Sequence, residues 1–219
     1  MTTSVYIGPK VRKLRQLYGQ LFDATFYSLP ITRQLELQAQ ILARAHQATE
    51  GAVCFQIASW HPRLRGRSDE EILEFAFTME DAKATVAREH GFQSWSEVDA
   101  GSSDVGFERA VDTMLSGDLA ALKEQVAARP DLVQARSRYG HGATVLHYAG
   151  SNGVESYRQV VPLNLADIVD FLIRAGADPQ AEATIYGGST ARALFESSTH
   201  PIQANVHEKV AAVFQEHGA

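Results

Sequence analysis

Apolar residues recur at intervals of three and four along most of the chain, which is the spacing of one face of an α-helix. Residues 9–22 show this pattern behind an early proline, Pro9, which is favoured in the first turn of a helix. Residues 34–46 repeat it, whereas the alternation typical of strands is almost absent. The pattern therefore predicts a mainly helical chain.

Capping signals and one featureless stretch divide the chain. Thr78 and Asp81 stand at the spacing of a capping box, and Gly91 follows the apolar run that they open. Residues 100–106 (Ala-Gly-Ser-Ser-Asp-Val-Gly) are mostly small or polar and carry no periodicity, which is typical of a linker. We therefore predict a helical N-terminal domain over residues 1–99, a linker over 100–106, and a second unit over 107–219.

A repeated motif follows the linker. Residues 144–149 read Thr-Val-Leu-His-Tyr-Ala, and residues 167–178 end in Arg-Ala-Gly-Ala-Asp. Both resemble the ankyrin repeat, whose first helix opens with Thr-Pro-Leu-His and whose second ends in Gly-Ala-Asp. Val145 replaces the usual proline, and His147 matches the structural histidine of the motif. The resemblance implies an all-α fold, a three-repeat ankyrin solenoid with the N-terminal helical domain packed against it.

The spacing of the copies indicates inserted segments. Thr144 and Thr190 open equivalent helices 46 residues apart, whereas a plain ankyrin period is about 33 residues. Repeat two therefore carries an insertion at 154–164, and repeat three is lengthened in the same connection within 197–205. We place the repeats at about 107–139, 140–183 and 184–219. Since stacked repeats bring equivalent positions side by side, we expect the two insertions to touch.

The resemblance extends beyond the repeats. Residues 63–66, 77–82 and 87–95 resemble the helical leader that precedes ankyrin repeats in many bacterial proteins, and residues 147–159, 186–188 and 198–201 are similar to the repeats of those proteins. The resemblance covers about residues 36–219 and leaves the first 35 outside. That family has no defined activity, so the resemblance implies only an interaction module.

The insertions supply the candidate binding residues. We expect a ligand or partner site formed by Glu155, Tyr157, Arg158, Gln159, Tyr186 and His200. Insertions in repeat proteins gather on one face, which is often the binding face. The alternative is that these groups hydrogen-bond one another, Arg158 to Glu155 above all, and only order two long loops.

A cofactor-independent enzyme is the alternative function, an isomerase, cyclase or lyase with a pocket between the N-terminal helices and the repeats. Acid–base chemistry needs a positioned proton carrier and a group that holds developing charge. The candidates of those types are His147, Glu155, Tyr157, Arg158 and His200. His207 begins a zinc-protease pattern that Ala211 breaks, and no phosphate-binding or dinucleotide motif is present. We therefore expect no metal and no cofactor.

Charge and composition narrow the partners. The net charge of −6 argues against a general nucleic-acid binder. Residues 1–35 hold five basic side chains against Asp23 alone, so a +4 arm precedes a remainder of −10. This basic amphipathic arm meets an anionic membrane or an acidic partner, or it packs by its apolar stripe on the acidic remainder of its own chain, which we favour. With a single cysteine, Cys54, and no signal segment, we expect a cytoplasmic protein. The leading function is binding of a protein or small molecule through the concave face and the insertions; the sequence does not indicate the oligomeric state.

Overall fold

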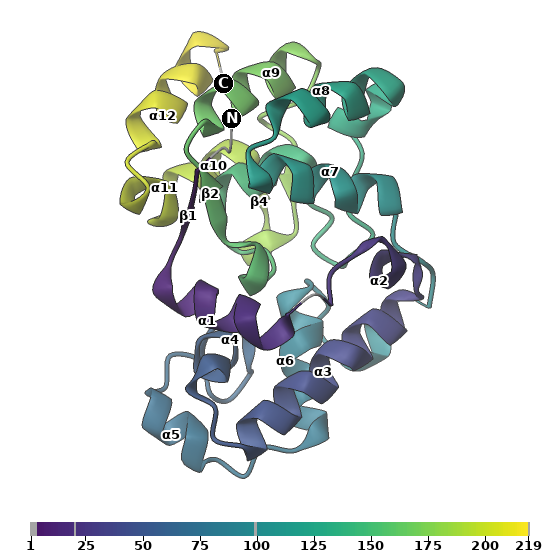
Figure 1. Cartoon of the computed structure of the whole chain (residues 1–219), viewed down its shortest axis with the longest axis vertical. Coiled ribbons are helices and arrows are strands. Elements are labelled where there is room, and N and C mark those ends of the chain that lie inside the picture. Colours follow the sequence, from purple (N-terminus) through teal and green to yellow (C-terminus); the bar gives the residue numbers. More distant parts are fainter. Residues whose placement is uncertain (1–3, 20, 99, 219) are drawn as a thin grey trace.

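The computed structural model describes residues 4–19, 21–98 and 100–218. The chain is mainly helical, as predicted (Figure 1). The α-helices are α1 (Pro9–Tyr18), α2 (Ala24–Ser28), α3 (Ile31–Gln47), α4 (Cys54–Trp60), α5 (Asp69–Glu74), α6 (Met79–Glu89), α7 (Val105–Ser116), α8 (Leu119–Ala128), α9 (Leu165–Arg174), α10 (Ala191–Glu196), α11 (His200–Gln203) and α12 (His207–Glu216). The 3₁₀-helices are η1 (Gly51–Val53), η2 (Trp95–Glu97), η3 (Pro130–Val133), η4 (Val145–Gly150), η5 (Ser156–Arg158) and η6 (Ile185–Gly187). The strands are β1 (Val5–Ile7), β2 (Val160–Pro162), β3 (Glu182–Ala183) and β4 (Ser189–Thr190).

Helices α3 to α6 form one body, residues 31–98, which we call the leader. Helix α3 begins at Ile31, three residues before the predicted start at residue 34. Thr78 and Asp81 form the predicted capping box before α6, and Ser68 and Glu71 form another before α5. Each box satisfies backbone N–H groups that the first turn of a helix leaves without partners. Helix α3 packs along α6, and their apolar faces make a core that includes Leu35.

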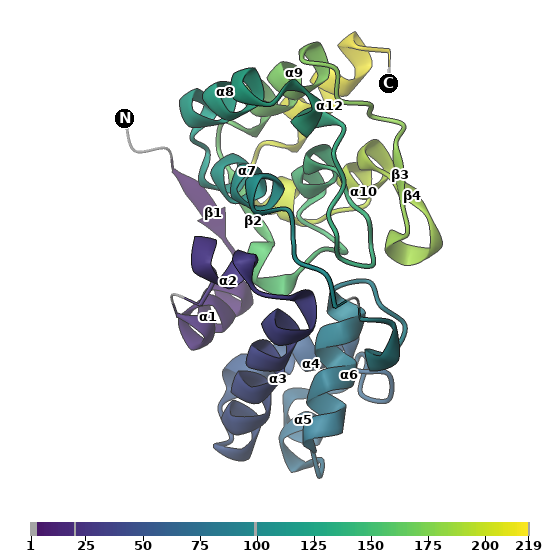
Figure 2. The same ribbon diagram turned by 90° about the vertical axis from the view of Figure 1, so that its right-hand side faces the viewer.

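The C-terminal body, residues 105–218, has two layers of helices, which we call the helical stack. Helices α8, α9 and α12 lie in the outer layer, and α7, η4 and α10 lie beneath them (Figures 1 and 2). Helix α7 begins at Val105, inside the predicted linker, because Asp104 caps it. The backbone N–H of Ile31 donates to the carbonyl of Gly101 at 2.8 Å, so this part of the predicted linker is fixed to the start of α3.

Two turns of the stack extend toward the leader. One is closed by a bridge between Arg136 and Thr144, and the other is the β3–β4 hairpin (Figure 2). In the first turn, Gly140 lies directly against Gly91 at the end of α6: a Cβ on Gly140 would lie 2.7 Å from the carbonyl carbon of Gly91. The leader and the stack therefore meet backbone to backbone at this point.

The N-terminal arm, residues 4–19, crosses from the leader to the stack. Strand β1 pairs antiparallel with β2, which lies inside the insertion 154–164. The sequence analysis predicted no strand at either place. Helix α1 buries Val11, Leu14 and Tyr18, so the arm packs by its apolar stripe as expected. The helix ends at Tyr18, before the predicted residue 22, because Gly19 turns the chain with a positive φ of 58°. No helix in the described ranges is long and apolar enough to cross a bilayer.

Candidate functional site

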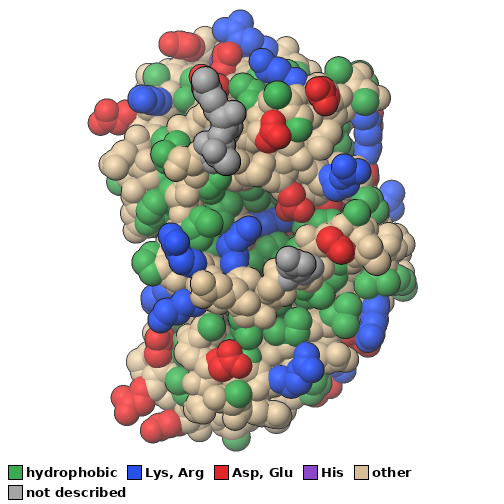
Figure 3. Space-filling view, in the orientation of Figure 1, with side chains coloured by type: hydrophobic (Ala, Val, Ile, Leu, Met, Phe, Trp, Pro, Cys, Tyr) green, Lys and Arg blue, Asp and Glu red, His purple; other side chains and the backbone are tan. Residues whose placement is uncertain are grey.

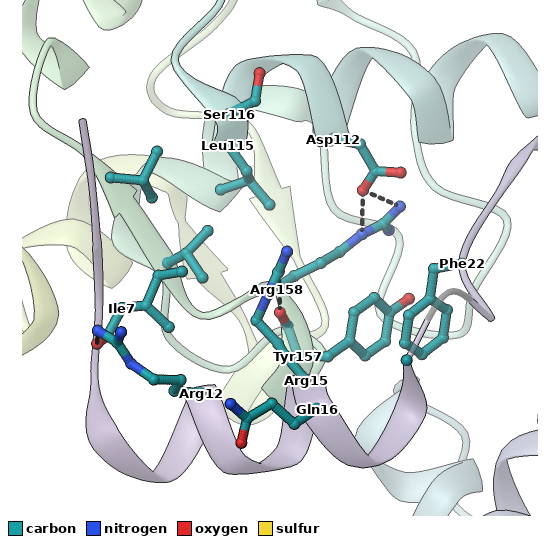
Figure 4. A pocket seen from close by; sticks show the side chains of 13 residues that line it. Ile7, Arg12, Arg15, Gln16, Phe22, Asp112, Leu115, Ser116, Tyr157 and Arg158 are labelled. Carbon is teal, nitrogen blue, oxygen red and sulfur yellow. Dashed lines mark hydrogen bonds and ion pairs between the residues drawn. The ribbon is translucent and has the colours of Figure 1, made fainter. Parts of the chain in front are cut away.

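A pocket of about 630 Å³ lies between the arm, α7 and the insertion 154–164 (Figure 4). We call it the arm pocket. Its volume is within the range of about 300–1,000 Å³ that small-molecule sites occupy. Aliphatic side chains from all three segments line it, namely Val5, Ile7, Leu115 and Val160. Because these side chains come from segments far apart in the sequence, the pocket exists only when the arm is docked.

One wall of the arm pocket is aromatic. The ring of Phe22 stacks on that of Tyr157, with centroids 3.5 Å apart and planes inclined by 6°. Tyr18 meets Tyr157 edge to face. The hydroxyl of Tyr157 is buried and has no hydrogen-bond partner in the part of the chain that the structure describes. Burial raises the pKa of this phenol well above its usual value, so it remains protonated and can donate.

Arg158, from η5, is buried at the inner end of the pocket with 1% of its surface exposed. Its Nε donates to Asp112 at 3.0 Å. One terminal nitrogen donates to Glu108 at 2.5 Å and to Glu155 at 3.2 Å. The other donates to the Tyr27 hydroxyl at 2.7 Å and to the Glu108 carbonyl at 3.4 Å. A guanidinium has five N–H donors, so Arg158 has none left for a ligand.

The carboxylates around Arg158 differ in their protonation. Burial raises the pKa of Glu108 to about 7 despite the attraction of Arg158. Burial also opposes the charge of Glu155, yet Arg158 and His141 hold the pKa of that carboxyl well below its usual range. The Glu155 carboxylate lies 3.7 Å from Nε2 of His141. Arg158 therefore joins α2, α7 and the insertion through a buried ion cluster.

A second buried carboxylate ties the insertion to the leader. Glu89, at the end of α6, accepts from the backbone N–H of Ser156 at 2.8 Å and from the side chain of Gln56. Gln56 in turn accepts from the Tyr18 hydroxyl at 2.8 Å. No cationic side chain among the described residues forms an ion pair with Glu89, and burial raises its pKa to about 7. This group holds or loses a proton near neutral pH.

The free positive charges of the pocket come from the arm. Arg15 donates to the Tyr157 carbonyl at 2.8 Å, and Arg12 donates to the Ile7 carbonyl at 3.3 Å. Neither forms an ion pair with any described carboxylate, and four of the five N–H donors of each have no partner among the described residues. Figure 4 shows both side chains pointing from α1 into the pocket, and Figure 3 shows basic side chains gathered at the groove between α1 and the stack.

The candidate residues named from the sequence separate into three places. Tyr157 and Arg158 line the arm pocket. Glu155 and Gln159 are buried behind it, and Gln159 donates to the Val154 carbonyl within its own loop. Tyr186 lies in a different pocket, at the tip of the β3–β4 hairpin.

The two histidine candidates lie apart from this set. His147 is buried: its Nδ1 accepts from the Thr144 backbone N–H, and its Nε2 lies 3.3 Å from the Ser189 carbonyl. Burial lowers its pKa to about 4. His200 begins α11, which packs against β2, and no described hydrogen bond or ion pair joins it to Arg158. The insertions therefore touch through α11 and β2, and the five candidates for acid–base chemistry do not converge on one pocket.

Arg12 and Arg15 were not among the predicted site residues. The positive charge of the amphipathic arm, to which both arginines belong, was visible in the sequence and could have pointed to an anion-binding role. Periodicity showed which side of α1 would be buried, but the pocket depends on the pairing of β1 with β2, which no local pattern indicated. In the described ranges, no group of three His, Cys, Asp or Glu side chains is placed to hold a metal ion. No family model, curated protein or solved structure matches the chain.

Proposed function

We propose that the helical stack is built of three ankyrin-type repeats. The register supports this: the bridge between Arg136 and Thr144 and the β3–β4 pair of Glu182 with Thr190 are displaced by the same 46 residues. Arg136 also donates to the Glu182 carbonyl, so consecutive turns lie side by side. Thr144 and His147 form the hydrogen-bonded pair expected where the first helix of such a repeat opens.

We further propose that the protein is a binding module whose arm pocket takes a small amphipathic carboxylate. The observation that carries this proposal is the pair Arg12 and Arg15, two guanidinium groups that face an aliphatic pocket without a carboxylate partner in the described chain. Unpaired donors beside an apolar wall complement a ligand with one anionic end and a hydrocarbon body.

The other charged residues of the pocket favour a ligand that carries a single anionic group. Asp112 also lines the pocket, and it is paired with Arg158 at 2.9 Å. The Arg158 cluster therefore adds no unpaired cation, and a highly charged ligand such as a polyphosphate would meet only the two arm arginines. A carboxylate bound there would bridge α1 to the stack. The ligand would then stabilise the docked arm, since binding to the folded state alone shifts the folding equilibrium.

The proposal is tested by calorimetric titration with octanoate. We expect the double variant Arg12→Met/Arg15→Met to bind octanoate at least tenfold more weakly than the wild type. A hydrogen bond to a charged group contributes about 1.5–3 kcal/mol, and about 1.4 kcal/mol changes a dissociation constant tenfold. Octan-1-ol, which has the chain without the charge, should bind both proteins equally.

The matched control is Lys10→Met/Lys13→Met, which removes the same charge from the same helix. Both lysines lie outside the arm pocket, beside Gly51 and Asp69. This variant should bind octanoate within about twofold of the wild type, because a distant charge is screened by salt. Circular dichroism and the unfolding temperature verify that each variant is folded. Equal losses in the two double variants, or a wild type that does not bind octanoate, would overturn the proposal.

A further inference from the structure

A second pocket, of about 260 Å³, lies where the leader meets the β3–β4 hairpin. We call it the leader pocket. Trp60, the last residue of α4, and Arg65, from the segment after it, line one side. Arg88, in the last turn of α6, and Phe92, just beyond that helix, line another, and His141 and Tyr186 come from the two turns of the stack. It shares no lining residue with the arm pocket. An inference drawn from it therefore does not rest on the function proposed above.

The arginines near this pocket fall into two kinds. Arg63 forms an ion pair with Asp81 at 2.7 Å, and Arg67 forms one with Glu71 at 2.9 Å. Arg65 and Arg88 line the pocket, and neither guanidinium has a hydrogen bond or ion pair to any residue that the structure describes. Guanidinium groups recognise oxyanions through parallel N–H donors. Of the four arginines in residues 63–88, the two whose guanidinium groups have no described partner are therefore the two that line the pocket.

Tyr186 is the most exposed large aromatic side chain of the described chain, at 56%, and its position is fixed. Its hydroxyl donates to Asn152 at 2.8 Å. Its ring lies over Gly153, where a Cβ would come within 3.0 Å of the ring. The backbone of Tyr186 is left-handed, with a φ of 53°. Such a conformation is uncommon for a residue other than glycine and costs on the order of 1 kcal/mol or more, and it persists where the surroundings enforce it.

We infer that the leader pocket is a second binding site, for a small aromatic oxyanion such as an aryl phosphate or aryl carboxylate. The unpaired Arg65 and Arg88 supply donors for the oxyanion. Tyr186 supplies a pre-positioned aromatic surface, which binds at a low cost in conformational entropy. The volume is below half that of the arm pocket, so the ligand is a single ring with its charged group.

The inference is tested with phenyl phosphate as the probe, titrated by calorimetry into the full chain. Inorganic phosphate has the charge without the ring, benzyl alcohol has the ring without the charge, and benzoate separates a carboxylate from a phosphate. We expect phenyl phosphate to bind one site per chain, and inorganic phosphate and benzyl alcohol to bind at least tenfold more weakly. Benzoate binding within tenfold of phenyl phosphate supports an aromatic oxyanion in general, and weaker binding narrows the ligand to a phosphate.

Three variants locate the site. Arg65→Met/Arg88→Met should weaken phenyl phosphate binding at least tenfold. The control Arg44→Met/Arg67→Met removes the same charge from the leader outside the pocket and should change it less than twofold. Tyr186→Asn removes the ring but keeps a residue that tolerates the left-handed backbone. It should weaken phenyl phosphate about fivefold and leave inorganic phosphate unchanged.

Several results would overturn the inference. They are no binding of phenyl phosphate by the wild type, equal losses in the two arginine double variants, and no effect of Tyr186→Asn. Arg12→Met/Arg15→Met should bind phenyl phosphate as the wild type does. A loss there would place the aromatic probe in the arm pocket and would also overturn the inference. Failure of octanoate to bind has no bearing on these results, so the two proposals can fail separately.

Discussion

Arg158 shows how a charged residue of the insertion serves the fold. Its side chain is buried, and its five donors meet two side-chain carboxylates of α7, the carbonyl of Glu108, the Tyr27 hydroxyl and Glu155. Its guanidinium also lies over the rings of Tyr27, Tyr148 and Tyr157, at 5.1–5.6 Å from their centroids. Burying charges is costly unless every group is paired. The insertion can bury Arg158 because each of the five N–H donors of its guanidinium has an acceptor.

Removal of that arginine should destabilise the protein strongly. We expect Arg158→Met to lower the free energy of unfolding by about 3–5 kcal/mol, because it leaves Glu108 and Glu155 buried without their cation. Urea unfolding followed by circular dichroism measures the change. The control is Arg174→Met, which breaks an exposed pair with Asp170 and should leave the free energy of unfolding nearly unchanged, because solvent and salt screen such a pair. A loss for Arg158→Met as small as that of the control would contradict the buried cluster.

Glu89 gives the stability a specific pH dependence. Burial raises its pKa from the ordinary 4.5 to about 7 in the folded protein, so the folded state holds the proton over that interval. Protonation then favours folding, and stability falls as the pH rises from about 4.5 through 7. Glu89→Gln removes this titration. We take the free energy of unfolding of the variant minus that of the wild type. We expect this difference to rise by on the order of 3 kcal/mol between pH 5 and pH 8, because only the wild type loses stability as Glu89 deprotonates.

The comparison of the two proteins isolates Glu89 from the groups that titrate nearby. His90 and His147, whose pKa values burial lowers to about 4, act in the opposite direction but are present in both proteins. The groups that face Glu89 are Gln56, Ser156 and, through its charge, Glu155. Urea unfolding at several pH values provides the measurement. A difference in stability that does not change with pH would contradict a buried, proton-holding Glu89.

At the scale of elements, the contact between α6 and the first turn of the stack depends on two glycines. A Cβ on Gly140 would lie 2.7 Å from backbone atoms of Gly91 and 2.9 Å from the Phe92 ring. We therefore expect Gly140→Ala to destabilise the protein by at least about 2 kcal/mol, since backbone atoms cannot move aside as a flexible side chain does. Thermal unfolding followed by calorimetry measures this loss.

The neighbouring glycine provides the control. Gly142 has a positive φ of 59° but no atom within 4 Å of its Cβ position. Gly142→Ala should therefore cost only about 1 kcal/mol, from the left-handed backbone. If both alanine variants unfold at the same temperature, the leader and the stack do not meet through Gly91 and Gly140.

Local patterns predicted the elements that local physics determines. The periodicity of residues 34–46 and the capping box at Thr78 predicted α3 and the start of α6, because both signals lie within one helix. The β1–β2 pair was missed, since it joins three-residue strands from Val5 and Val160, far apart in the sequence. Such strands are too short to show an alternating pattern, and their pairing depends on the docked arm.

The same limit applies to the candidate site. Tyr157 and Arg158 were named because the register of the predicted repeats indicates an insertion at 154–164, and both residues line the arm pocket. Their chemistry was not visible: only the packed structure shows that every donor of Arg158 is used. Arg12 and Arg15 were counted as charges of the arm, but the direction in which they face follows from the strand that precedes them.

At the scale of the whole molecule, the arm connects two bodies with separate apolar cores. Val11 belongs to the core of the stack, Leu35 to that of the leader, and Leu14 and Tyr18 form a third cluster with Tyr157 between them. Each of the two pockets lies at a boundary of these bodies, where small-molecule sites are common. A ligand in either pocket would therefore contact more than one of these bodies.

The distribution of charge follows the same arrangement. The +4 arm docks on the acidic remainder through its apolar stripe, and no described ion pair joins its α1 cations to a carboxylate. The basic side chains thus remain available at the surface and in the groove (Figure 3). If the arm were held by ion pairs, its guanidinium and ammonium groups would already be paired with carboxylates and could not bind an anionic ligand.

Nuclear magnetic resonance of the arginine side chains tests the central claim most directly. In the ¹⁵N-labelled protein, the Nε–Hε signals are followed as octanoate is added. We predict saturable shifts of the Arg12 and Arg15 signals with one dissociation constant, while those of Arg65 and Arg88 stay in place. Arg158 should change little, because its donors are already bonded. Saturable shifts at Arg65 and Arg88 instead, or no saturable shift at Arg12 and Arg15, would contradict a carboxylate site in the arm pocket.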